Sequence, residues 1–228
     1  MTQDKINIDY YSDVLCVWAY IAQIRLDELN KSLSQSVSIT PHFISLFANT
    51  EQRIGDGWKN KGGFDGFAEH VQHAVEPYPH CPVNQNVWTH CRPSTSANAH
   101  LFIRSFDLAL TSLDEHATNS ELLDTFIWKV RCAFFQDARD ISQFDVLQDV
   151  VKSCDVDVST VMRFIENGKA LAAIMAENQL KETLKLEGSP TYVFNNGRQK
   201  LYGNVGYKII EANINELLSN DSNSASWC

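Results

Sequence analysis

Residues 5–29, KINIDYYSDVLCVWAYIAQIRLDEL, decide the fold of this chain. Apolar side chains alternate at Ile6, Ile8 and Tyr10, which predicts a short strand. Asp13, a favourable residue at the start of a helix, then precedes an apolar segment with helical spacing. The next apolar run, VSITPHFISLF, predicts a second strand. The chain therefore opens with a strand, a helix and a strand.

The rest of the chain changes from helices back to strands. Helical patterns fill the middle, and the strand patterns TYVFN and RQKLY then follow, joined by Asn196-Gly197, a pair that favours hairpin turns. A last helical segment, GYKIIEANINELL, closes the pattern. This order predicts an α/β protein with a thioredoxin fold and a large all-helical insertion after the second strand. We expect a thioredoxin-like domain built from residues 1–48 and 186–219, an insertion at 49–185 that includes the helix returning to the sheet, and a flexible tail at 220–228.

The composition excludes several classes of function. The chain has 228 residues, a net charge of −9, and no cluster of lysine and arginine of the kind that binds phosphates. We therefore expect no nucleic-acid partner. No apolar run approaches the roughly 20 residues of a membrane span, and the first residues lack the basic and apolar regions of a signal peptide. These features predict a cytoplasmic protein with no membrane partner.

Cys16 is the candidate catalytic residue among six cysteines. It follows the first strand and its turn, and we expect it in the first turn of the first helix. Unpaired backbone N–H groups and the helix dipole favour an anion at that place. The position therefore predicts a thiolate with a pKa below the ordinary value of about 8.5.

Histidine and cysteine pairs in the middle of the chain invite comparison with a zinc site. His80-Cys81 and His90-Cys91 lie in EPYPHCPVNQNVWTHCRP, but their spacing does not match a compact zinc motif. We therefore predict no metal. The prolines of this stretch indicate a loop over the active site, in which Trp88 is a candidate for lining a substrate pocket; the role of the two pairs stays open.

Three segments carry a resemblance to a known family. SDVLCVWAYIAQIRLDEL resembles the first active-site helix of DsbA-like, FrnE-like and 2-hydroxychromene-2-carboxylate isomerase proteins. LEGSPTYVFNNG is similar to the proline loop and third strand of this family, and LYGNVGY to its closing turn. Kappa-class glutathione transferases share the same architecture. The chain is thus identified as a member of the DsbA-like group of thioredoxin-fold proteins.

The resemblance implies a site around Cys16 and Pro190. In this family a cis proline lies against the active-site cysteine, and the residue before it pairs with an extended thiol peptide by its backbone. We therefore expect a cis bond between Ser189 and Pro190, and binding of a thiol substrate or glutathione by Ser189. Trp18 is expected to shield one side of the sulfur.

A second binding region is implied at the turn before the last helix. Gly203 and Asn204 match the turn at which glutathione-using relatives hold the γ-glutamyl group, and helix N-termini favour carboxylates. The relatives carry an aspartate where this chain has Val205. Glutathione is therefore the expected co-substrate, with a weaker site than in those relatives.

Position 19 separates this chain from the disulfide oxidants of the family, because it holds alanine where they hold a second cysteine. A lone thiolate forms a mixed disulfide that an outside thiol must resolve. The sequence therefore favours a single-cysteine thiol oxidoreductase, with glutathione-dependent disulfide reduction or deglutathionylation of a peptide or small molecule. A glutathione-dependent isomerase or transferase and a redox-inactive peptide-binding module stay open. The sequence also leaves open the identity of the substrate, the formation of a homodimer and any role of Cys228.

Overall fold

The computed structural model describes residues 5–112 and 119–219. The tail predicted at 220–228 lies outside the described residues, so its flexibility and the role of Cys228 stay predictions. Within the described ranges, no helix is both long and apolar enough to cross a membrane.

The elements follow the predicted order. The chain begins with β1 (Ile6–Ser12), α1 (Val17–Ser32) and β2 (Val37–Phe43). Two short turns and a series of α-helices come next: η1 (Glu51–Asp56), η2 (Lys59–Lys61), α2 (Gly63–Val75), α3 (Ala97–Ser112), α4 (Asn119–Phe135), α5 (Phe144–Lys152), α6 (Val158–Glu166) and α7 (Lys169–Thr183). The chain then returns to the sheet with β3 (Thr191–Phe194), η3 (Asn195–Gly197), β4 (Gln199–Tyr202) and α8 (Tyr207–Ser219).

The sheet has the strand order β2-β1-β3-β4. β1 and β2 are parallel, which requires a crossover, and α1 supplies it. β3 is antiparallel to β1, and β4 is antiparallel to β3. Asn196 and Gly197 both have positive φ between β3 and β4, the conformation that their residue types favour. The predicted α/β thioredoxin fold is confirmed.

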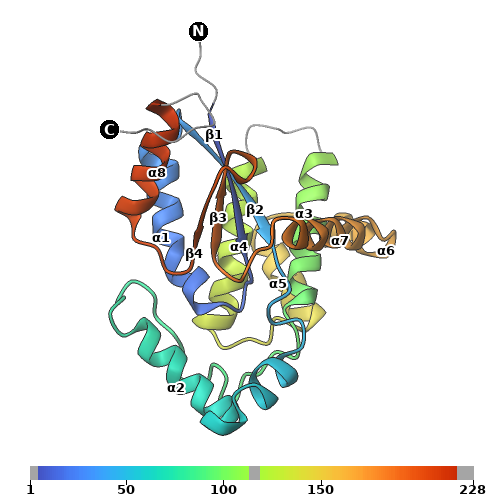
Figure 1. Ribbon diagram of the computed structural model, residues 1–228. Helices are drawn as coiled ribbons and strands as arrows, with labels where there is room; N and C mark the ends of the chain where they lie inside the picture. The colour runs from blue at the N-terminus through green and yellow to red at the C-terminus, as the bar shows by residue number, and fades with distance from the viewer. Residues whose placement is uncertain (1–4, 113–118, 220–228) are drawn as a thin grey trace.

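Alternation along β1 gives the sheet two buried faces. Ile8 and Tyr10 lie on the face covered by α1 and α8, where they pack with Leu26 and Ile214. Tyr11 belongs to the opposite face, and α3 and α7 lie on that side of the sheet (Figure 1). α1 thus packs on the face of the sheet opposite α3 and α7, and its N-terminal end lies near the C-terminal end of β1.

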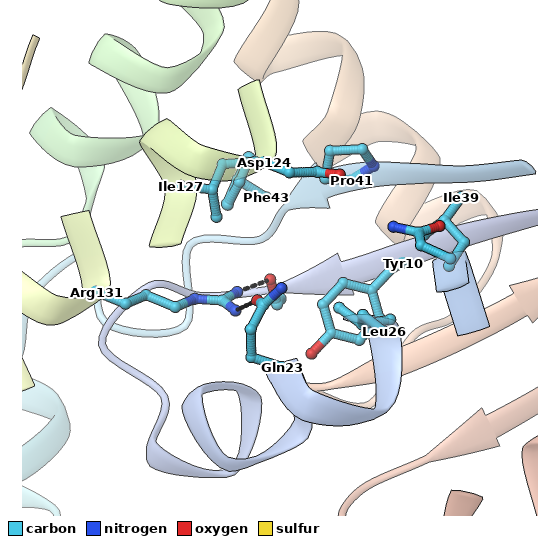
Figure 2. A pocket seen from close by; sticks show the side chains of 11 residues that line it. Tyr10, Gln23, Leu26, Ile39, Pro41, Phe43, Asp124, Ile127 and Arg131 are labelled. Carbon is cyan, nitrogen blue, oxygen red and sulfur yellow. Dashed lines mark hydrogen bonds between the residues drawn. The ribbon is translucent and has the colours of Figure 1, made fainter. Parts of the chain in front are cut away.

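Arg131 of α4 connects the helical region to α1 and β1 (Figure 2). The residue is 1% exposed, and its guanidinium donates to the side-chain oxygens of Gln23 and Ser12, each at 2.9 Å. It also donates to the carbonyl of Ala19 at 3.3 Å. These contacts fix α4 against the first half of α1, which is the half that begins at Cys16.

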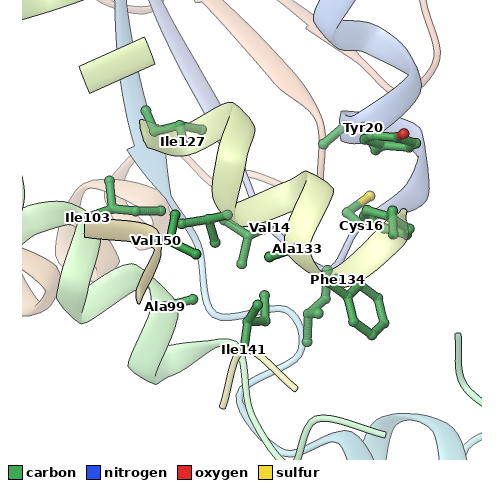
Figure 3. Packing of buried hydrophobic residues seen from close by; sticks show 14 of the residues in the cluster. Val14, Cys16, Tyr20, Ala99, Ile103, Ile127, Ala133, Phe134, Ile141 and Val150 are labelled. Carbon is green, nitrogen blue, oxygen red and sulfur yellow. The ribbon is translucent and has the colours of Figure 1, made fainter. Parts of the chain in front are cut away.

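The main apolar core lies between the helices and includes the start of α1. Val14 and Cys16 belong to the same cluster of buried residues as Phe134 and residues of α3 (Figure 3). Deeper in this cluster the rings of Phe106 and Phe126 stack at 4.1 Å. The active-site end of α1 is therefore part of the core of the helical region.

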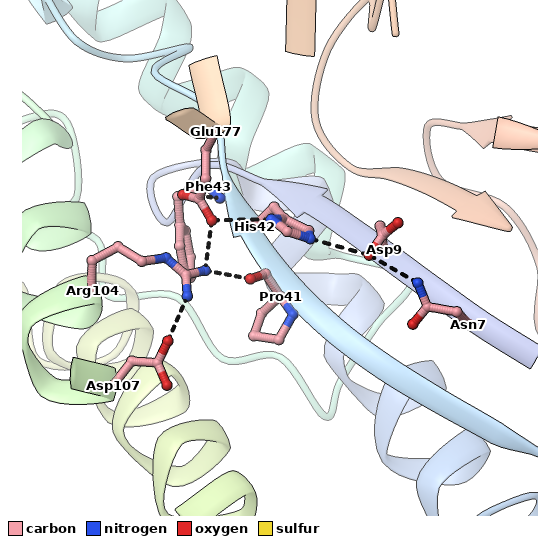
Figure 4. Close-up of polar contacts among 8 residues, drawn as sticks. All are labelled: Asn7, Asp9, Pro41, His42, Phe43, Arg104, Asp107 and Glu177. Carbon is pink, nitrogen blue, oxygen red and sulfur yellow. Dashed lines mark hydrogen bonds and ion pairs between the residues drawn. The ribbon is translucent and has the colours of Figure 1, made fainter. Parts of the chain in front are cut away.

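A polar network joins α7 and α3 to β2 and β1 (Figure 4). Glu177 of α7 accepts from Arg104 at 2.9 Å and lies 3.1 Å from Nδ1 of His42 on β2. The other ring nitrogen of His42 lies 3.2 Å from Asp9 on β1. Since Glu177 and Arg104 are both nearly buried, these charges are paired as buried charges require.

Candidate functional site

Cys16 occupies the N-cap of α1, one residue before the first helical turn in which the sequence placed it. Its backbone is extended, with φ −79° and ψ 114°. The backbone N–H of Cys16 donates to the carbonyl of Asp13 at 3.0 Å, and its own carbonyl accepts from Ala19 at 3.1 Å. The sulfur thus lies at the end of the helix where backbone N–H groups are free.

The loop of Pro190 lies directly against Cys16. The bond between Ser189 and Pro190 is cis. The thiol of Cys16 donates to the carbonyl of Ser189 at 3.3 Å, and the hydroxyl of Ser189 accepts from the backbone N–H of Asp13 at 3.0 Å. Two hydrogen bonds therefore join the loop before β3 to the loop before α1. The carbonyl expected to meet a substrate is occupied by the protein's own thiol.

Burial changes the expected acidity of Cys16. The residue is only 4% exposed, and burial raises the pKa of its thiol above the ordinary value. The backbone N–H groups of Ala19 and Trp18 lower this pKa, as the helix-end argument requires, while the negative charge of Asp13 raises it. The predicted lowering of the pKa is therefore wrong for the free protein. The prediction counted the helix end but not the loss of water around the sulfur.

Asp13 forms a buried centre behind Cys16. It is fully buried, and its carboxylate accepts from three groups: the backbone N–H of Leu15 at 2.9 Å, the backbone N–H of Phe47 at 2.8 Å, and the hydroxyl of Ser96 at 2.7 Å. From sequence, Asp13 is predicted only as a residue of the helix start. The available signal was an acidic residue inside the apolar run YYSDVLCVWAY, three positions before the cysteine.

His100 completes the buried polar group. It lies in α3, is fully buried, and its Nε2 accepts from the backbone N–H of Val14 at 3.3 Å. The same nitrogen is 3.7 Å from Asp13. Burial lowers the pKa of His100, so the ring is neutral at neutral pH. Nothing in the sequence pattern around His100 indicated this position.

The closing turn approaches the site from the other side. The backbone N–H of Gly203 donates to the carbonyl of Pro190 at 2.8 Å, and Gly203 adopts φ 90°, which glycine allows without strain. The side-chain amide of Asn204 donates to the hydroxyl of Tyr78 at 2.9 Å. The structure thus joins Gly203 to the Pro190 loop and Asn204 to the segment after α2.

Trp18 faces the helical region. Its ring meets His70 of α2 edge-on with centroids 6.4 Å apart, and Trp58 lies 5.1 Å from the same histidine. Trp18 therefore belongs to an aromatic group beside the start of α1.

Trp88 does not line a pocket. It is fully buried and packs against Phe47, Phe67 and Phe134. The expectation of a pocket-lining tryptophan is wrong because the loop folds its ring into the core. Among the described residues there is no group of three side chains suited to a metal ion.

A family model described as the DSBA-like thioredoxin domain matches residues 79–215. The chain belongs to the DsbA-like thioredoxin family. The match covers the helical region, the Pro190 loop and the closing turn, but it begins after Cys16.

Solved structures of this family share the fold. The chain is similar to the cytosolic disulfide reductase DsbM from Pseudomonas aeruginosa, with a TM-score of 0.66, 17% identity, and 92% and 98% of the two chains covered. A structure of that protein with GSH gives a TM-score of 0.61 at 16% identity, with 93% and 96% covered. A 2-hydroxychromene-2-carboxylate isomerase gives 0.65 at 18% identity, with 92% and 95% covered. At these identities the likeness concerns the fold.

Proposed function

We propose that this DsbA-like protein is a single-cysteine thiol oxidoreductase that uses glutathione to reduce disulfides or to remove glutathione from thiols. The observation that carries this proposal is the contact between the thiol of Cys16 and the carbonyl of Ser189, at 3.3 Å beside a cis proline. A substrate sulfur seated beside Pro190 would meet Cys16 directly.

The reaction with a glutathionylated thiol needs one cysteine. The Cys16 thiolate attacks the glutathione sulfur of the mixed disulfide, so the Cys16–glutathione bond forms while the substrate leaves as a thiolate and takes up a proton. The thiolate of a second glutathione then attacks the glutathione sulfur on Cys16. Glutathione disulfide forms, and Cys16 leaves as a thiolate. Two electrons pass to the substrate, and Ala19 has no part in the exchange.

Substrate binding is what activates Cys16 in this scheme. In the free protein the thiol is buried and donates its proton to the Ser189 carbonyl. When the backbone N–H of an extended thiol peptide donates to that carbonyl instead, Cys16 loses its acceptor and turns to the free N–H groups at the start of α1. The thiolate is then formed where it is used.

Glutathione is assigned to the surface between Ser189 and Asn204. The cysteinyl part would pair with Ser189, and the γ-glutamyl carboxylate would reach Gly203, Asn204 and the start of α8. Val205 offers no carboxylate for the amino group, so we expect weak binding. A reaction that depends on reduced glutathione suits the cytoplasm, where we place the protein, and its partners are thiol or disulfide peptides or small molecules.

A second candidate is a glutathione-dependent isomerase or transferase. The aromatic group of Trp18, Trp58 and His70 beside the start of α1 favours it, because flat rings bind flat electrophilic substrates. In that case bound glutathione supplies the reacting sulfur, and replacement of Cys16 by serine retains activity.

Mass spectrometry after incubation with glutathione disulfide tests the main proposal. We expect one glutathione on Cys16, no adduct there in Cys16→Ser, and an internal disulfide in place of the adduct in Ala19→Cys. Cys154→Ser is the matched control, since it removes another buried thiol and should keep the adduct on Cys16. If Cys16 takes up no glutathione and Cys16→Ser has no effect on disulfide reduction, the protein is instead the isomerase or a peptide-binding module.

A further inference from the structure

Asp13 is the residue through which four separate segments meet behind Cys16. Its backbone N–H donates to the hydroxyl of Ser189 in the loop before β3, and its carbonyl accepts from the N–H of Cys16. Its carboxylate holds Phe47, after β2, and Ser96, before α3. Each of these contacts is buried, at 2.7 to 3.0 Å.

A carboxylate at this place is not required for helix capping alone. The N-cap residue is Cys16, which has no side-chain capping bond, and Asp13 lies three residues outside the helix. Its one local bond, to the N–H of Leu15, uses a single oxygen. The other oxygen is committed to the distant Phe47 and Ser96. A fully buried charge costs free energy unless hydrogen bonds satisfy it. The three donors that bind the Asp13 carboxylate therefore stabilise a negative charge at this place.

We propose that Asp13 is a positioning residue for the reaction of Cys16, which holds the loop before α1 against the Pro190 loop and imposes a negative field on the sulfur. This inference rests on the proposed function, in which Cys16 is the reacting thiol. The field adds to the effect of burial, which is the larger cause of the raised pKa of Cys16, and it destabilises the thiolate, which makes that thiolate a stronger nucleophile when a substrate arrives.

Other titratable groups near Cys16 do not produce this field. From β1, Tyr10 interacts with the sulfur, but burial raises its pKa well above the ordinary value, so it is neutral between pH 6 and about 9. From α3, His100 lies beside Asp13, and burial lowers its pKa, so it is neutral at neutral pH and above. Arg131 of α4, which donates to the carbonyl of Ala19, brings a positive charge to the same region. Asp13 is therefore the acidic group that acts on Cys16.

The test measures the pKa of Cys16 from the pH dependence of its alkylation by iodoacetamide, followed by mass spectrometry of the peptide that contains it. Asp13→Asn removes the charge and keeps a carbonyl oxygen, so we expect the pKa of Cys16 to fall by about one unit. Ser96→Ala removes a donor and leaves the charge less neutralised, so we expect the pKa of Cys16 to rise. Asp27→Asn is the matched control, because Asp27 is an exposed acid on α1 that accepts from Gln23; it should leave the pKa of Cys16 unchanged.

Opposite shifts in the two variants support the inference, since a loosened loop would move both in the same direction. The inference is overturned if the pKa of Cys16 shifts in the same direction in both variants. It is also overturned if Asp13→Asn folds and leaves that pKa unchanged. If Asp13→Asn does not fold, the sign of the shift in Ser96→Ala decides: a fall or no change overturns the inference. No disulfide substrate is used, so a failed glutathione adduct on Cys16 would reject the proposed function without altering this result.

Discussion

At Cys16, two opposing effects act on the same sulfur. The N–H groups at the start of α1 stabilise a thiolate, while burial and the charge of Asp13 stabilise the thiol. Burial is the larger effect, because the sulfur has almost no contact with water and donates to the Ser189 carbonyl. Cys16 can therefore stay unreactive, although it lies at a helix N-terminus, until a substrate takes its place at the Ser189 carbonyl.

We predict that Cys16 alkylates more slowly in the native protein than in the unfolded chain. A raised pKa leaves less thiolate at neutral pH than in the unfolded chain, and burial slows access of the reagent further. Iodoacetamide labelling at pH 7, with and without urea, followed by mass spectrometry, measures both rates. A native rate above the unfolded rate would restore the sequence-based expectation of an acidic thiol.

The residues of the site could be named from sequence only in part. Cys16 was predictable because a strand, a turn and a helix start are local features. Ser189 and Pro190 followed from the resemblance to the DsbA-like family, and the structure brings the three together. The burial of Cys16 and the role of His100 depend on packing between segments more than 80 residues apart, as the bond from Val14 to His100 shows. No local pattern carries that information.

Among the elements, α7 is joined to the sheet by charged contacts. Glu177 meets Arg104 of α3 and His42 of β2, and it also accepts from the backbone N–H of Phe43 at 3.2 Å. Burial lowers the pKa of His42, but its hydrogen bonds to Asp9 and Glu177 raise it by more. The stability that this protonation supplies is full below the ordinary pKa of about 6.5 and is lost as the pH rises past the raised value.

We predict that Glu177→Gln lowers the free energy of unfolding by about 3 kcal/mol at neutral pH, because it removes the buried carboxylate that Arg104 and His42 share and leaves Arg104 paired with the more exposed Asp107. Asp149→Asn, which removes an exposed partner of Arg139 and Lys152, should leave the free energy of unfolding nearly unchanged. Urea denaturation of both variants measures the difference. Equal, small effects would mean that packing alone holds α7.

The strands and the turn between β3 and β4 were predictable because alternation and Asn-Gly act locally. The burial of side chains in the loop after α2 was not predictable. Its prolines and histidines indicate an exposed loop, yet Trp88 and Cys81 are buried there, since the aromatic core of the helical region accepts them. The composition of a segment indicates its average solvent exposure. It does not predict that one particular side chain is buried.

Across the whole molecule, the helical region and the site share one core, because Val14 and Cys16 belong to the same cluster as Phe106 and Phe126. We predict a single cooperative unfolding transition. Phe106→Ala should lower the free energy of unfolding by about 3–5 kcal/mol. The loop that carries Cys16 should unfold in the same transition. Urea denaturation, followed by tryptophan fluorescence and separately by labelling of Cys16, measures both. Two separated transitions would show that the helical region unfolds on its own.

High pH should weaken the whole fold through its buried thiols. Burial raises the pKa of Cys81, Cys91 and Cys132 to about 11, against about 8.5 for an unfolded thiol. A raised folded pKa means that the unfolded state loses its protons first, so the stability from these thiols is full below about pH 8.5 and is lost as the pH rises toward 11. Tyr20 and Tyr192, with pKa values raised to about 12, extend the loss to higher pH.

We therefore expect the free energy of unfolding, measured in urea under reducing conditions, to fall steadily from pH 8.5 to pH 11. Cys132→Ala should fall less steeply than the unchanged protein over that range, because one titrating thiol is gone. Asp149→Asn removes only an exposed acid that is already ionised, so it should follow the unchanged profile. A flat profile in the unchanged protein, or an identical slope in Cys132→Ala, would show that these thiols titrate in the folded state as they do in the unfolded chain.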